Sequence, residues 1–132
     1  MQGTARGTYR TTGWRQQEYG GADAGPKLTL AEKDLALEGG LEGSAVGRSS
    51  LVTWGTGSSA AIGHVRFTGR IGGRSGSFVV EESVKGGAGG ATATWRIVPE
   101  SGSGELGGIA GEGNWEWKPG VEQVSYSLSY RL

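Results

Sequence analysis

The feature that most constrains the fold of this chain is an alternation of apolar and polar residues with a period of two. From position 124 to the end, apolar residues occupy one face, and serines and an arginine occupy the other; the apolar residues are Val124, Tyr126, Leu128, Tyr130 and Leu132. This pattern is typical of a half-buried β-strand. Segments 109–118 and 91–97 alternate in the same way. Three strands are therefore expected in the last third of the chain.

The earlier part of the chain is expected to form further strands. They cover segments 4–19, 28–37, 41–54, 59–71 and 75–85, and the first of them is rich in Thr, Tyr and Trp. Segment 30–38 has the composition most favourable for a helix, but it is short and ends in two glycines. Leu28 and Leu30 share one phase while Leu35 and Leu37 share the other, so a β-bulge is expected between the two pairs.

Glycine accounts for 28 of the 132 residues, and most of it falls between the expected strands. A collagen-like fold is excluded because glycine does not recur at every third position and there are only 3 prolines. About eight strands joined mostly by short glycine-rich turns, with further glycines inside strands that must bend, predict a single closed antiparallel β-barrel. We expect one domain over residues 1–132. A β-sandwich is the alternative architecture.

Composition excludes several functional classes. Lys and Arg (13) balance Asp and Glu (13), so no basic excess indicates a nucleic-acid partner. With no cysteine and only His64 as histidine, a multi-histidine or thiolate metal site is excluded, and no cofactor is expected. The GxGxxG pattern at 102–107 lies between strands rather than before a helix, so it predicts a turn and not a nucleotide site. No membrane span or signal peptide is evident, and a cytoplasmic location is the default expectation.

Three stretches together carry a family resemblance: GGRSGSFVV at 72–80, TWRIVP at 94–99 and SGSGELGGIAGEG at 101–113. The chain resembles a small bacterial family of unknown function with barrels similar to allene oxide cyclase. Dirigent proteins and some bacterial polyketide cyclases have similar barrels. The resemblance implies an eight-stranded barrel with a central cavity in which a reactive apolar intermediate is shaped, as in natural-product biosynthesis.

Glu82 is the candidate catalytic carboxylate. It is in phase with Phe78, Val80 and Val84, and if that face points inward the carboxyl group enters a low-dielectric cavity where it can move a proton. A strand-end position in solvent is the alternative. His64 shares its face with Ile62, Arg66 and Thr68 and is interpreted as a surface residue.

The 5 tryptophans are the strongest composite signal for a binding cavity. Aromatic residues occupy the apolar phases of the last three expected strands and should lie side by side. As cavity lining they would hold an apolar substrate; the candidate substrate-binding residues are Trp54, Trp95, Trp115, Trp117, Phe78 and Tyr130. For Trp95 a structural role in the core is preferred. Tyr126 or Tyr130 is the candidate donor to a substrate carbonyl, which makes Tyr126 the second candidate catalytic residue.

The resemblance, taken with these residues, implies a cofactor-independent cyclase or isomerase that shapes an apolar, polyketide- or terpenoid-like substrate in the barrel. Holding a flexible chain in a reactive fold accelerates such a reaction without a nucleophile. Two alternatives stay open. One is a non-catalytic, lipocalin-like protein that binds an apolar ligand, and the other is a structural homo-oligomer with aromatic subunit contacts.

Overall fold

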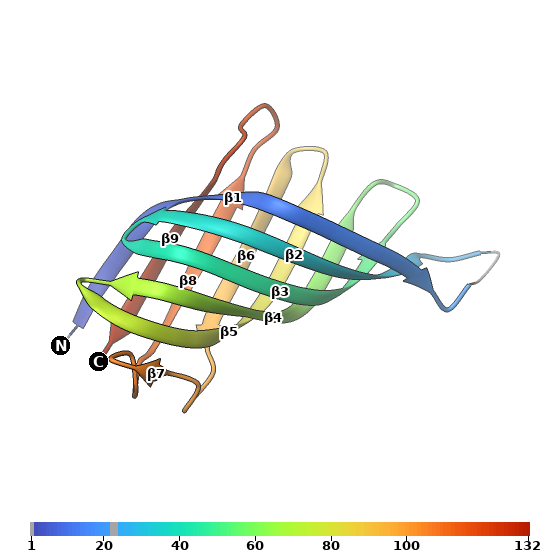
Figure 1. Cartoon of the computed structure of the whole chain (residues 1–132). Helices are drawn as coiled ribbons and strands as arrows, with labels where there is room; N and C mark the ends of the chain where they lie inside the picture. Colours follow the sequence, from blue (N-terminus) through green and yellow to red (C-terminus); the bar gives the residue numbers. More distant parts are fainter. Residues whose placement is uncertain (1, 22–23) are drawn as a thin grey trace.

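The computed structural model describes residues 2–21 and 24–132, and these form one antiparallel sheet closed into a barrel (Figure 1). The strands are β1 (Gln2–Tyr19), β2 (Lys27–Gly39), β3 (Leu41–Thr53), β4 (Ser59–Ile71), β5 (Arg74–Gly87), β6 (Gly90–Ile97), β7 (Ser103–Gly104), β8 (Ala110–Trp117) and β9 (Val124–Arg131). The described part of the chain contains no helix long and apolar enough to span a membrane.

Eight of the strands form the barrel wall, and each pairs with the next along the chain. The sheet closes because β1 pairs with β9 at one edge and β4 pairs with β5 in the middle of the chain. The two-residue strand β7 is an addition, which pairs with β5 at Gly76 and Ser77. The prediction of a closed barrel of about eight strands is therefore confirmed, and the sandwich alternative is wrong because no edge of the eight-stranded sheet is left open.

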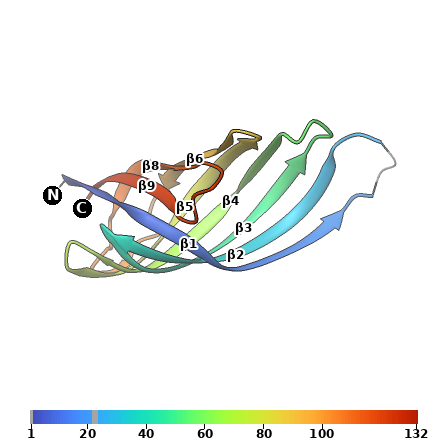
Figure 2. The same ribbon diagram turned by 90° about the horizontal axis from the view of Figure 1, so that it is seen from above.

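The two ends of the barrel differ. The chain termini, β7 and the tight β2–β3 and β4–β5 hairpins lie at one end, and the β1–β2, β3–β4, β5–β6 and β8–β9 connections lie at the other (Figures 1 and 2). The first end is filled with apolar side chains. Its most deeply buried residues come from the wall and from the connection between β6 and β8: Leu41, Ile71, Phe78, Leu106, Ile109 and Leu128. We call the end that holds the termini and these apolar residues the closed end, and the opposite end the open end.

The expected bulge lies in a different strand from the one predicted. Strand β2 is regular along its length, and its inward residues include Ala31, Lys33 and Leu35. The irregularity lies in β1, between Thr11 and Gly13. The phase change seen in the leucines of β2 has another cause: Leu28 and Leu30 simply face outward.

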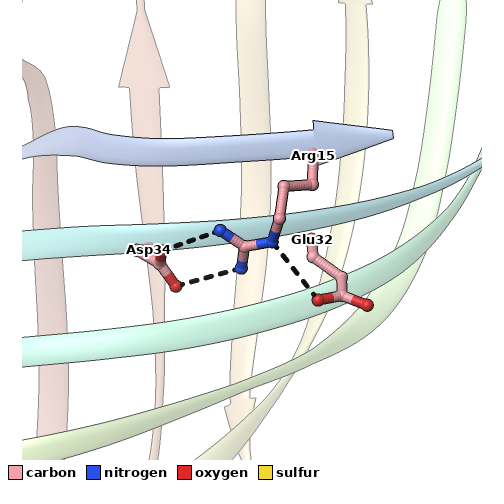
Figure 3. A network of polar contacts seen from close by, with 3 residues as sticks. All are labelled: Arg15, Glu32 and Asp34. Carbon is pink, nitrogen blue, oxygen red and sulfur yellow. Dashed lines mark hydrogen bonds and ion pairs between the residues drawn. The ribbon is translucent and has the colours of Figure 1, made fainter. Parts of the chain in front are cut away.

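The outer face beside this bulge carries a small network of charged side chains (Figure 3). Arg15 of β1 bonds both carboxylate oxygens of Asp34 on β2, at 3.0 and 3.3 Å, and its Nε lies 3.6 Å from Glu32. The hydrogen bond from Arg15 lowers the pKa of Asp34. Glu32 and Asp34 thus lie on the outer surface, where Arg15 links β1 to β2.

Glycine at position 63 is required by the close approach of two strands. A Cβ atom there would meet the main-chain carbonyl of Arg48 and the Cα of Ser49 on β3. We expect Gly63→Ala to lower the free energy of unfolding by about 1–3 kcal/mol, the usual cost of overpacking, measured by urea denaturation. Gly55→Ala is the matched control, because Gly55 lies in the β3–β4 turn with no heavy atom within 4 Å of its would-be Cβ. Equal losses in the two variants would contradict the explanation.

Candidate functional site

A buried carboxylate organises the inside of the barrel. Glu82 points inward from β5 and is 1% exposed. Its Oε2 accepts hydrogen bonds from the indole Nε1 atoms of Trp95 and Trp115, both at 2.8 Å, and its Oε1 accepts one from Lys33 Nζ at 2.7 Å. The donors come from β6, β8 and β2, so this one side chain joins four strands across the barrel.

Lys33 is the cationic partner of Glu82. It occupies an inward position on β2, and its side chain is 11% exposed. Its ammonium group also lies 5.6 Å from the centre of the Trp115 ring, a distance typical of a cation–π contact. The charge of Lys33 is therefore balanced by Glu82 and further stabilised by the ring beside it.

Tyr9 completes the group of polar residues. Its ring stacks on Trp95, with centroids 6.5 Å apart, and meets Trp115 edge-on at 6.1 Å. Burial, and secondarily the negative charge of Glu82, raise the pKa of Tyr9 well above its usual value. The hydroxyl is therefore protonated across the physiological range, and it makes no hydrogen bond to any described residue. No fully buried polar side-chain atom among the described residues lacks a partner, so the Tyr9 hydroxyl must border open space.

That space is a cavity of about 620 Å³ at the open end of the barrel. Glu82, Lys33, Tyr9 and Trp115 lie on its inner wall. Most of the remaining lining is aromatic or aliphatic and comes from β1, β2, β3, β4, β5, β6, β8 and β9; these residues are Trp14, Ala31, Leu51, Ala61, Val84, Ala91, Trp117 and Val124. The cavity is thus an apolar chamber with one buried ion pair and, at Tyr9, a buried ring whose hydroxyl bonds no described residue.

The local sequence makes room for this site by placing small residues beside large ones. Across the sheet, Glu82 pairs with Gly63 on one side and Trp95 on the other, and Trp95 in turn pairs with Gly113. In the next row of paired residues, Val84 lies between Ala61 and Ala93. Ala93 in turn pairs with Trp115. Since glycine and alanine fill little volume, two indole rings and a carboxylate fit inside a narrow barrel.

The structure places Glu82, Trp95, Trp115 and Trp117 together, as their shared inward phase indicated. Trp115 and Trp117 line the cavity, while Trp95 lies beneath its wall and bonds Glu82. The indole of Trp117 is held by a 2.7 Å bond to the carbonyl of Val121. Within the candidate set, these tryptophans and Glu82 form one contiguous group.

Tyr126 faces inward but its hydroxyl group is bonded elsewhere. It accepts a hydrogen bond from the Leu41 amide at 2.9 Å and donates to the carbonyl of Glu38 at 2.7 Å. Burial raises its pKa, which the Leu41 hydrogen bond partly offsets. Its hydroxyl fastens the β2–β3 hairpin to the barrel, so the geometry gives Tyr126 a structural task.

The other three candidates lie away from the cavity. Phe78 is buried at the closed end and packs on Phe67, with ring centroids 5.3 Å apart. Tyr130 lies near the chain termini, beside Gly3. Trp54 is 43% exposed in the β3–β4 turn. His64 lies on the outer face, as expected.

Sequence reasoning missed Tyr9 and Lys33. Each shares the phase of buried apolar residues on its strand, which indicates an inward position. Tyr9 is in phase with Ala5, and Lys33 is in phase with Leu35 and Leu37. A lysine in the apolar phase of a strand is the usual sign of a buried ion pair. No group of three or more His, Cys, Asp or Glu side chains among the described residues is placed to hold a metal ion.

Comparison with known proteins identifies a family. A family model described as "Protein of unknown function (DUF3224)" matches residues 5–130. The crystal structure of a protein of unknown function from the DUF3224 family of Shewanella oneidensis MR-1 is similar to the whole chain, with a TM-score of 0.79. The two share 22% sequence identity over 100% of this chain and 98% of the other, so this likeness concerns the fold. No curated protein matches the chain.

The Lys33–Glu82 pair makes a prediction about stability. Removing one partner leaves a buried charge uncompensated, so Glu82→Gln and Lys33→Met should each lower the free energy of unfolding by about 3–5 kcal/mol. The double variant should lose less than the sum of the two, because it leaves no unpaired charge. Urea denaturation of all three variants measures the coupling. Lys27→Met, which removes the exposed pair with Glu18, is the control and should have little effect; additive losses at Lys33 and Glu82 would refute the coupling.

The raised pKa of Tyr9 predicts a loss of stability in alkali. Above pH of about 10 the unfolded chain releases the tyrosine proton while folded Tyr9 keeps it, so the folded state binds more protons. The free energy of unfolding contributed by Tyr9 therefore falls as pH rises, by about 1.4 kcal/mol per pH unit. Tyr9→Phe should make the fall between pH 10 and 11.5 shallower by that amount. Tyr19→Phe, at an exposed ring, should leave the slope unchanged; an identical slope in Tyr9→Phe would disprove the assignment.

Proposed function

Because the chain belongs to the DUF3224 family, whose function is unknown, we propose a function from the geometry of its barrel: the open end binds a small, mainly apolar molecule. The observation that carries this proposal is the cavity of about 620 Å³ walled by aromatic and aliphatic side chains. Its volume falls in the range of about 300–1,000 Å³ that is usual for small-molecule sites.

The rigidity of the cavity wall supports this proposal. The indoles of Trp115 and Trp117 are fixed by hydrogen bonds to Glu82 and to the Val121 carbonyl. Trp14 donates to Gln16 at the rim, at 2.9 Å. A wall whose rings are held before the ligand arrives loses little conformational entropy on binding, which favours affinity.

The state of Glu82 favours binding over proton transfer by this carboxylate. Three donors converge on its two oxygens, and one of them is the ammonium group of Lys33. Both carboxylate oxygens are therefore already occupied as hydrogen-bond acceptors. Glu82 is therefore better suited to holding the wall together than to serving as an acid or base.

A cofactor-free cyclase or isomerase is the second candidate function, and the unpaired Tyr9 hydroxyl favours it. A protonated donor inside an apolar chamber polarises a bound carbonyl, and the chamber holds a flexible substrate in one fold. In this version Tyr9 takes the role that the sequence suggested for Tyr126 or Tyr130.

Binding is tested with N-phenyl-1-naphthylamine, a neutral apolar dye that fluoresces strongly out of water. We expect the protein to enhance its emission saturably, with a dissociation constant in the micromolar range or about 8 kcal/mol of binding free energy. Ala61→Phe places a ring in the cavity and should weaken dye binding at least about tenfold, which is about 1.4 kcal/mol.

The neighbouring substitution Ala60→Phe is the matched control. Ala60 precedes Ala61 on β4, so its side chain lies on the opposite face of the sheet. This variant should bind the dye within twofold of the wild type. No saturable binding by the wild type, or equal weakening in both variants, would rule out the cavity as the site.

A further inference from the structure

The charges and donors of the cavity narrow the chemical class of its ligand. We propose that the ligand is a neutral, ring-containing molecule with a carbonyl oxygen that accepts a hydrogen bond from the hydroxyl of Tyr9. This inference rests on the proposed binding function and goes further by naming the ligand class and the recognising group.

The cavity has no net charge with which to select an ion. Its acidic and basic lining residues are two of each sign, Lys33 and Arg10 against Glu82 and Glu122. The inner two are paired with each other at 2.7 Å, and the outer two are exposed at the rim. An anionic group placed deep in the cavity would lie close to the Glu82 carboxylate, and a cationic group would lie close to the Lys33 ammonium. A neutral ligand avoids both repulsions and the cost of removing an ion from water.

Tyr9 supplies a donor that lacks an acceptor. Of the lining polar side chains without a partner among the described residues, Tyr9 is the most buried at 4% exposed, since Ser49 is half-buried and Thr11 is exposed. Burial raises its pKa, so the group is a hydroxyl and not a phenolate. The hydroxyl borders the cavity, so a ligand that covers it must supply an acceptor or leave the donor unsatisfied, which costs free energy.

The same wall disfavours a ligand that must donate hydrogen bonds there. The carboxylate of Glu82, beside Tyr9, is 1% exposed and already accepts three hydrogen bonds. A ligand hydroxyl buried at this depth would compete with the donors already in place. A carbonyl oxygen only accepts hydrogen bonds, so it can accept one from the Tyr9 hydroxyl without adding a donor to the cavity.

The shape of the lining favours a ring. Tyr9, Trp14, Trp115 and Trp117 present four aromatic rings to the cavity, while Ala31, Ala61 and Ala91 leave space between them. Flat rings gain from stacked or edge-on contact with aromatic walls in addition to the burial of apolar area.

The test uses 6-propionyl-2-(dimethylamino)naphthalene, a neutral naphthalene ketone whose emission shifts to the red when its carbonyl accepts a hydrogen bond. The wild-type protein should bind it, and Tyr9→Phe should raise its dissociation constant by about three- to tenfold, the effect of one hydrogen bond. The emission of the dye bound to this variant should shift to the blue. Tyr19→Phe makes the same change at an exposed ring outside the cavity and should leave both the dissociation constant and the emission unchanged.

N-phenyl-1-naphthylamine, which has no carbonyl, separates this inference from the proposed function. Tyr9→Phe should bind it within twofold of the wild type, which also shows that the variant folds. If neither dye binds the wild type, the proposed function fails and this inference fails with it. If N-phenyl-1-naphthylamine binds but the ketone does not, or Tyr9→Phe changes neither its affinity nor its emission, only this inference is overturned. Tighter binding of the anionic 1-anilinonaphthalene-8-sulfonate than of the neutral dyes would also overturn it.

Discussion

The burial of one carboxylate inside the barrel is the constraint on which the rest of the structure depends. A charge in apolar surroundings is tolerated only when it is paired and hydrogen-bonded. Glu82 meets that condition with Lys33 from β2 and two indoles from β6 and β8. These three donors must stay within hydrogen-bond distance, so they fix the separation of strands on opposite sides of the barrel. They also fix the rings that form the inner wall of the cavity.

The division of the barrel into a packed end and an open end follows from side-chain volume. At the closed end, leucines, isoleucines and Phe78 fill the interior, and the β6–β8 connection adds Leu106 and Ile109. Toward the open end the inward positions of several strands are small, as at Ala31, Ala61 and Ala91. The space left between these residues and the tryptophans is the cavity. In the proposed function the ligand occupies this incompletely filled space, beside a carboxylate that Lys33 neutralises.

Part of this site is readable from alternation alone. The phase of β5 places Glu82 on the inward face with Phe78 and Val80, and the phases of β6 and β8 place Trp95 and Trp115 there as well. Alternation does not distinguish Tyr126 from Tyr9, because both face inward and only their surroundings differ. One hydroxyl bonds the backbone of the β2–β3 hairpin, and the other has no partner among the described residues. The bulge was misplaced for a related reason, since the leucines of β2 change phase without any break in pairing.

The sequence by itself determined most of the strands and favoured a closed barrel, because a period of two and glycine-rich turns act within a few residues of each other. Only the tertiary structure decided which inward residues meet. Lys33 and Glu82 are 49 positions apart, and Trp115 is 33 beyond Glu82, so their contact depends on how far the closed sheet carries each strand around the barrel. Alternation tells the side of a strand on which a residue lies, but it carries no information about the residue across the interior. The closed sheet brings Lys33 to Glu82 and leaves the Tyr9 hydroxyl without a hydrogen-bond partner in the described part of the chain.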